Sequence, residues 1–246
     1  MPHDAILALA AFGAGVLNAI AGGGSFLTLP ALVLGGVPPV PANATSAVAV
    51  FPGYIGSVWG QRREIAALDR RLLWQIGWVS LLGGVLGAAL LLVTSNKAFQ
   101  ALVPWLLLFA TALFALGPRA RPGPEGGPPP RWRPWALGAT AVYGGYFNGG
   151  LGILLMAVLS FSRAGNLHVV NALKNLVSAL LAAISVAIFA AAGIVRWREA
   201  VLMMVCCTVG GYLGARLSTV LPARAVRWLV IVVGLAMSAA FFARTA

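Results

Sequence analysis

Charged residues are scarce in this chain, and acidic residues are the scarcest. Only 9% of its 246 residues are Asp, Glu, Lys or Arg, and only five of these are acidic. A soluble domain carries roughly a quarter charged residues, so the shortage excludes an ordinary cytosolic enzyme and a disordered tail. Because 60% of the residues are hydrophobic and the mean hydropathy is +0.92, we expect an all-α polytopic membrane protein.

Cysteine is rare as well. Cys206 and Cys207 are the only two, and adjacent residues on a helix point about 100° apart. The chain therefore has no disulfide framework and no cysteine-rich metal site, and we expect neither a metal ion nor a cofactor. The residues before the first apolar run lack the basic stretch of a secretory signal, so residues 5–22 are expected to remain in the protein.

Basic residues outnumber acidic ones, which gives a net charge of +12. They form no single face; they cluster in the short gaps between apolar runs. Basic loops set the orientation of membrane proteins, so we expect a lipid bilayer as partner and no nucleic acid. The tryptophans lie near the ends of apolar runs, as in the aromatic belts at membrane surfaces.

Eight apolar runs follow one another, at about 5–35, 42–60, 72–94, 98–117, 134–162, 168–195, 199–218 and 223–243. About 20 residues cross the hydrocarbon of a bilayer, so six runs fit one crossing each. The first and fifth are too long for one straight helix, and both contain a glycine cluster. Glycine weakens a helix interior by about 1 kcal/mol per residue. We therefore predict that each of these runs is broken into two half-length helices.

The chain divides into a first transmembrane repeat (1–117), a Pro/Gly-rich linker (118–133) and a second transmembrane repeat (134–246). Two motifs recur between the halves in the same order and at nearly the same offset. Gly15-x-x-Asn18 recurs as Gly145-x-x-Asn148, and Gly83-Gly84-x-x-Gly87-Ala88 recurs as Gly210-Gly211-x-x-Gly214-Ala215. Internal duplication explains this order.

The broken segments decide how the two repeats are related. Four full crossings in each half would give parallel repeats. If each broken segment dips in and returns, three crossings remain and the repeats are inverted. The basic residues in the loops discriminate weakly. We favour inverted repeats, because broken helices that meet near mid-membrane are a known feature of inverted-repeat transporters.

The first glycine cluster is the first candidate site. Its residues are Asn18, Gly22, Gly23, Gly24 and Ser25. Glycines let backbone N–H groups approach a ligand, and a helix beginning near Ser25 would point its positive end at an anion. The alternative is close helix packing through small residues. The polar flanking residues, together with the copy at Asn148 and Gly149 in the second half, favour a binding site.

Two polar groups inside later apolar runs complete the candidate set. Asn43, Thr45 and Ser46 open the second run, where they would cap a helix, contact a substrate, or both. Asn171, Lys174 and Asn175 share one face near the start of the sixth run. Lys174 either snorkels to the lipid headgroups or supplies positive charge in the pathway, and we favour the pathway.

The cargo is expected to be an anion. No Asp or Glu lies in the middle of an apolar run, whereas a cation site usually needs carboxylates or many carbonyl groups. A passive anion channel is one alternative to a transporter. An intramembrane enzyme that uses Ser25 is another, but a serine nucleophile needs a base within reach. Only His3 and His168 exist, both near segment edges, so we expect no enzyme.

The motifs resemble those of the sulfite exporter TauE/SafE family over nearly the whole chain. The segments that carry the resemblance are Gly13-x-Gly15, Gly22-Gly23-Gly24-Ser25-Phe26-Leu27, Pro30, Ala42-Asn43-Ala44-Thr45-Ser46, Pro52-Gly53, Asn171-Ala172-Leu173-Lys174-Asn175, Gly193-x-Val195-x-Trp197 and Gly210-Gly211-x-x-Gly214-Ala215-Arg216. The second half departs from the pattern, because Asn148-Gly149-Gly150-Leu151-Gly152 lacks a Gly-Gly-Gly-Ser run.

The resemblance implies a multi-pass transporter of the bacterial plasma (inner) membrane with two homologous halves. Its expected cargo is a small sulfur-containing anion, such as sulfite or an organosulfonate. The resemblance implies an exporter. From the duplication we expect alternating access, with the binding site near the membrane midplane. The particular anion, the direction of transport, the coupling ion and the oligomeric state are not indicated by the sequence.

Overall fold

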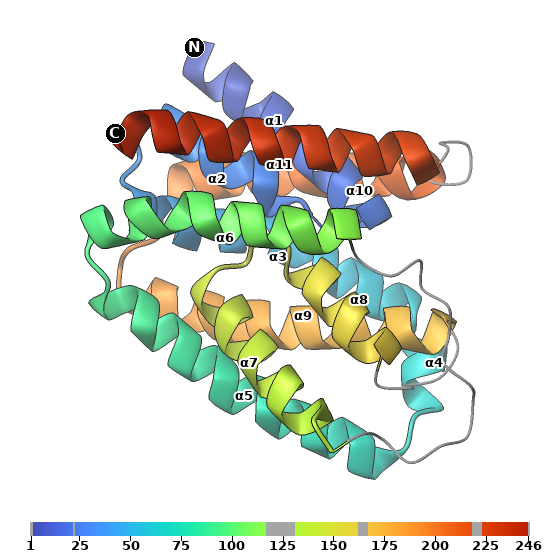
Figure 1. The fold of residues 1–246 in the computed structure, drawn as a ribbon. Helices are drawn as coiled ribbons and strands as arrows, with labels where there is room; N and C mark the ends of the chain where they lie inside the picture. The colour runs from blue at the N-terminus through green and yellow to red at the C-terminus, as the bar shows by residue number, and fades with distance from the viewer. Residues whose placement is uncertain (1, 22, 117–130, 162–166, 218–222, 246) are drawn as a thin grey trace.

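The computed structural model describes residues 2–21, 23–116, 131–161, 167–217 and 223–245, and every regular element within these ranges is a helix (Figure 1). The helices are α1 (Pro2–Ala21), α2 (Ser25–Leu34), α3 (Pro39–Gly60), α4 (Arg62–Ala66), α5 (Arg70–Val93), α6 (Asn96–Leu116), α7 (Arg133–Tyr146), α8 (Leu151–Phe161), α9 (Leu167–Ala191), α10 (Trp197–Leu217) and α11 (Ala223–Thr245). The expected all-α fold is confirmed for this part of the chain.

Three of the described helices are long and apolar enough to cross a membrane, over Arg70–Val93, Asn96–Leu113 and Val169–Ala191. Shorter apolar helical stretches occur at His3–Ala19, Ser25–Leu34, Leu151–Ser160 and Ile231–Ala243. All eight tryptophan side chains are exposed. Exposed indole rings on apolar helices are typical of side chains that face lipid or its headgroups.

The helix is interrupted at both glycine clusters, as the sequence predicts, but the expectation of half-length helices is wrong for α1, which has 20 residues. In the first half α1 ends at Ala21 and α2 begins at Ser25. Leu27, in the first turn of α2, lies against Gly13 of α1. The imidazole ring of His3, near the start of α1, lies against Gly35, which follows α2. The chain therefore reverses at the glycines, and α2 runs back along α1 as the second arm of a helical hairpin.

The second half contains a corresponding hairpin. α7 ends at Tyr146, and α8 begins at Leu151 with its side chain against Gly144 of α7. Figure 1 shows α8 turning back beside α7 after this interruption. Gly150, in the turn, has a φ of +74°, a left-handed conformation that glycine adopts without steric cost.

Helices α3 and α9 pack antiparallel at the centre of the molecule. Near the end of α3, Gln61 accepts a hydrogen bond from Asn175 near the start of α9, with an Nδ2 to Oε1 distance of 2.8 Å. Near the opposite end, Asn43 of α3 and Phe189 of α9 line the same crevice. Residues later in α3 therefore lie beside residues earlier in α9, which makes the two helices antiparallel.

Helices α6 and α11 also pack antiparallel. The ring of Trp105 meets Phe242 edge-on at a centroid distance of 5.2 Å. Further along α6, Thr111 lies against Gly234 of α11. Higher numbers on α6 thus pair with lower numbers on α11, as for α3 and α9.

The repeated glycine motifs pack against each other across the halves. A Cβ atom added at Gly15 of α1 would overlap the backbone of α10 at Cys207, and one added at Gly210 would overlap the backbone of α1 at Phe12. Between α5 and α7, a Cβ atom at Gly87 would overlap the carbonyl oxygen of Val142. The small residues let helix backbones touch. At these positions the packing interpretation of the glycines is the one the structure supports.

Candidate functional site

A narrow crevice lies where α3, α9 and the second interruption meet. It has no room for a water-sized sphere. The described residues that line it are Asn43 and Ala47 of α3, Gly144, Gly145 and Asn148 of the second hairpin, and Ala182, Ser185 and Phe189 of α9. None of these lining residues is ionisable.

Asn148 is the most unusual of the lining residues. It lies in the non-helical turn between α7 and α8 and is only 6% exposed. Neither its Nδ2 nor its Oδ1 atom has a hydrogen-bond partner. The hydroxyl group of Tyr54 lies close to this amide. The hydroxyl group of Ser185, on the facing helix, is also buried without a partner. Buried polar groups are almost always hydrogen-bonded, so two unpartnered groups at one crevice indicate a place for a ligand.

Asn43 holds the second hairpin against α3. Its Nδ2 atom donates a hydrogen bond to the backbone carbonyl oxygen of Tyr146, the last residue of α7, at 2.9 Å. The interpretation of Asn43 as a cap of its own helix is wrong. α3 begins at Pro39, with Pro38 in the capping position, and the N–H group of Val40 in its first turn donates to Asn96 Oδ1 at 3.0 Å. Asn43 instead satisfies a carbonyl group at the end of another helix.

Thr45 and Ser46 also make hydrogen bonds that stabilise packing. The Thr45 hydroxyl group donates to the Pro41 carbonyl oxygen at 2.7 Å and accepts from the backbone N–H of Arg196 at 3.0 Å. Ser46 shares a 2.6 Å hydrogen bond with Thr28 of α2. The structure places both residues beside Asn43 on α3, with their hydroxyl groups already paired.

The first interruption is a tight turn. The Gly23 and Gly24 carbonyl oxygens each accept a 3.1 Å hydrogen bond from an N–H group in the first turn of α2, and Ser25 is buried at its first position. A Cβ atom at Gly24 would lie 2.7 Å from the carbonyl oxygen of Ala14. Gly24 is thus needed for the close approach of the hairpin arms. Gly22 lies outside the described residues.

The two hairpin turns approach each other. Gly150 lies against the ring of Phe26, in the first turn of α2. The side chain of Asn18, near the end of α1, lies against Gly53 of α3, and its Oδ1 atom is buried without a partner. Because Tyr54 follows Gly53 and lies close to Asn148, this part of α3 separates the asparagines of the two halves.

The structure places Lys174 away from the crevice. It lies near the start of α9, partly buried, between the partly buried Asn171 and the hydrogen-bonded Asn175. Ser185 lies about 16 Å further along the helix axis, by the rise of an α-helix. Gly149 is buried beside Asn148, and its carbonyl oxygen accepts a 2.7 Å hydrogen bond from the Tyr143 hydroxyl group. The predicted residues therefore divide between the crevice and the Lys174 end of α9.

Ser185 and Tyr54 are site residues that sequence reasoning did not select. A serine within an apolar run is a weak signal, because such hydroxyl groups usually bond to their own helix. Nothing in the sequence around Tyr54 distinguishes it from a packing residue.

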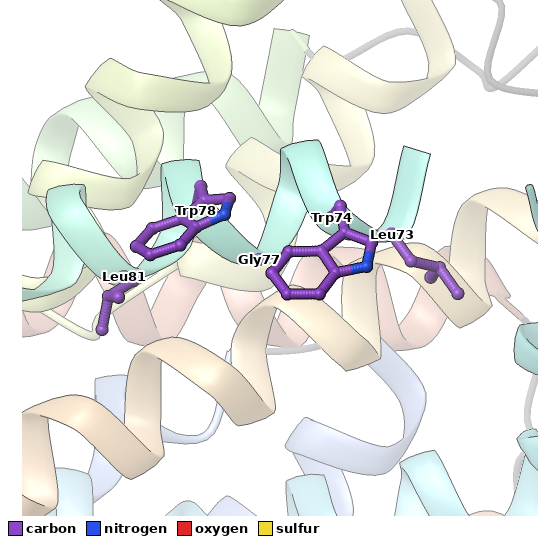
Figure 2. Close-up of a pocket in the computed structure, with 5 residues that line it drawn as sticks. All are labelled: Leu73, Trp74, Gly77, Trp78 and Leu81. Atoms are coloured by element: carbon purple, nitrogen blue, oxygen red, sulfur yellow. The ribbon is translucent and has the colours of Figure 1, made fainter. Parts of the chain in front are cut away.

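A larger groove lies elsewhere, on the outer face of α5. Figure 2 shows the rings of Trp74 and Trp78 on either side of Gly77, with Leu73 and Leu81 at the ends. Both rings are more than half exposed. This groove is open and almost wholly apolar, so it has the character of a lipid-facing surface and not of a site for a polar ligand.

Comparison with known proteins identifies the class. The chain is 28% identical over 244 residues to a probable membrane transporter protein, ORF9, of Sinorhizobium sp., covering 95% of this chain and 90% of the relative. It is 27% identical over 249 residues to a probable membrane transporter protein of Haemophilus influenzae, covering 96% and 92%. It is 28% identical over 251 residues to the probable membrane transporter protein YfcA of Escherichia coli, covering 95% and 87%. No solved structure gives a significant match.

The interrupted apolar helices and the similarity to these relatives together identify this protein as a membrane transporter. The family model described as sulfite exporter TauE/SafE matches residues 7–241, and the chain belongs to this family.

Proposed function

We propose that the protein exports a small sulfur-containing oxyanion, such as sulfite or an organosulfonate, across the bacterial plasma membrane. The observation that carries this proposal is the unpartnered Asn148 amide in a crevice beside the meeting point of two hairpin turns. Transporters commonly place substrate sites at such interruptions, because only there is backbone free to bind a ligand within the membrane. The family supports the sulfur-containing cargo.

Alternating access is the mechanism that this arrangement favours. The crevice has no room for a water molecule, which fits a closed state of a transporter better than an open channel. The asparagine amides would donate to the anion, helped by the backbone N–H groups of Gly23, Gly24 and Ser25. Lys174 would attract the anion toward the N-terminal end of α9.

Inverted repeats are part of the proposal. Equivalent helices of the two halves, α3 with α9 and α6 with α11, pack antiparallel. When the equivalent helices of two copies run antiparallel, a rotation axis perpendicular to the helices relates the copies. In a membrane such an axis lies in the membrane plane, which is the arrangement of inverted repeats. Both hairpins reverse direction, so three helices in each half would cross the bilayer.

Flux measured in proteoliposomes tests the function. Sulfite and sulfoacetate efflux should saturate with concentration and proceed at transporter turnover. A conductance far above that rate, without saturation, would identify a passive anion channel. No flux of either anion, from protein that is folded in the same vesicles, would contradict the proposed cargo. A covalent label that depends on Ser25 would instead favour an intramembrane enzyme.

A further inference from the structure

The crevice offers a ligand both kinds of hydrogen-bonding group. Asn148 presents an N–H donor and a carbonyl acceptor, both buried and unpartnered, and Ser185 adds a hydroxyl group. The Nδ2 atom of Asn43 is already bonded to the Tyr146 carbonyl oxygen. A ligand that contains only acceptor oxygens would pair the donors but leave the Asn148 oxygen buried against negative charge. Leaving a buried acceptor unpaired costs its desolvation, which no contact then offsets.

The crevice also lacks positive charge among its described lining residues. Lys174 lies about 16 Å from Ser185 along α9. Desolvating an ion costs an energy that rises with the square of its charge, and only paired charges offset it. A doubly charged anion would therefore pay about four times the desolvation cost of a singly charged one, in a crevice with no cation to offset it.

We infer that the crevice selects a singly charged anion that carries its own hydrogen-bond donor, such as a sulfonate with a hydroxyl group. This inference rests on the proposed function and narrows its substrate class. The sulfonate oxygens accept from the Asn148 amide N–H and the Ser185 hydroxyl group. The hydroxyl group of the ligand donates to the Asn148 Oδ1 atom, so the unpartnered groups of Asn148 and Ser185 are all paired. The crevice widens to admit such a ligand.

Three ligands that are fully ionised at neutral pH test separately the requirement for a single negative charge and the requirement for a hydrogen-bond donor. Isethionate is a singly charged sulfonate with a hydroxyl group. Propanesulfonate has nearly the same shape and charge, with a methyl group in place of the hydroxyl group. Sulfoacetate is doubly charged and has no donor at neutral pH. Binding to the purified full-length protein in detergent is measured for each by calorimetry, and isethionate is expected to bind about tenfold more tightly than propanesulfonate, with sulfoacetate the weakest.

Variants assign the preference to the crevice. Asn148→Leu should reduce the preference for isethionate over propanesulfonate to less than about twofold. Ser185→Ala should weaken the binding of both ligands alike and keep the preference, because the Ser185 hydroxyl group contacts sulfonate oxygens that both ligands carry. Thr111→Val is the matched control, because Thr111 is also buried with an unpartnered hydroxyl group but lies against Gly234 of α11. It should keep the preference of the unchanged protein.

The outcomes distinguish this inference from the proposed function. Equal binding of isethionate and propanesulfonate, or tightest binding of sulfoacetate, overturns the inference and leaves an anion transporter. A preference that survives in Asn148→Leu also overturns it, since a group other than the Asn148 amide would then bind the donor of the ligand. If sulfite, isethionate and sulfoacetate all fail to bind folded protein, the proposed function fails together with the inference.

Discussion

The two hairpin turns begin from the same motif but place their asparagines differently. In the first half Asn18 lies within α1, which continues to Ala21 before the turn. In the second half α7 ends at Tyr146, so Asn148 lies in the turn itself. The residues after each asparagine explain the difference. Ala19-Ile20-Ala21 continues a helix, whereas Gly149-Gly150 ends one, with Gly150 at positive φ.

The difference extends to the residues opposite each turn. If Asn43 and Asn171 are equivalent, as their sequence positions indicate, Ala182 at the crevice corresponds to Tyr54 on the other side. Ala47 and Phe189 correspond in the same way to Asn175 and Gln61, which are hydrogen-bonded to each other. Under this correspondence, larger or mutually paired side chains occupy the counterpart of the crevice. We therefore expect only one of the two similar halves to hold a binding site.

The largest expected effect is a loss of stability when the glycine contacts between the two halves are disrupted. Gly15→Ala and Gly87→Ala each insert a methyl group into a backbone–backbone contact, between α1 and α10 or between α5 and α7. We expect each to destabilise the protein by about 3 kcal/mol, because the backbone cannot yield as a side chain can. Thermal unfolding in detergent measures this.

Gly56→Ala is the matched control for both glycine substitutions. Gly56 also lies within a helix, but no atom lies near the position of an added Cβ. Its unfolding midpoint should be unchanged or slightly raised, since alanine favours the helix. If all three variants unfold together, the close contacts between the halves do not stabilise the fold.

The second prediction tests the asymmetry itself. Asn148→Leu should lower sulfite flux by at least about tenfold, because it removes the donor and acceptor at the crevice. It should not lower stability, because the Asn148 amide has no partner to lose. Asn18→Leu should reduce flux much less. Flux in proteoliposomes and thermal unfolding are measured on the same preparations. Equal losses of flux in the two variants would mean that both turns bind the substrate alike.

The sequence predicts the helical fold and the two interruptions well, because composition and glycine clusters act locally. The same local reasoning fails at Asn43, whose role depends on a carbonyl group at Tyr146, far away in sequence. It also misses Ser185, since only the packing of α9 against the second turn makes its hydroxyl group part of a crevice. Lys174 attracts attention as a charge in an apolar run, but the direction of α9 places it far from Asn148.

A third prediction concerns the filled counterpart of the crevice. Gln61→Ala and Asn175→Ala remove the two ends of one hydrogen bond between α3 and α9. A double-mutant cycle on thermal unfolding should give a coupling energy of about 1 kcal/mol. Gln61→Ala combined with Asn171→Ala, on the same face of α9, should show no coupling. Coupling in both cycles would indicate a general rearrangement of α9 and not a single bond.

The smallest expected effect is the loss of flux when the charge of Lys174, outside the crevice, is removed. Because Lys174 lies outside the crevice and is partly exposed, we expect it to affect the approach of the proposed anion and not its bound state. Lys174→Gln should lower sulfite flux about threefold at low ionic strength, and the difference should vanish in high salt, where such long-range attraction is screened. Lys97→Gln, an exposed lysine at the start of α6, should leave flux unchanged. A loss at Lys174 that persists in high salt would mean that the ammonium group contacts the bound anion, which would bring the two separated groups of residues into one site during transport.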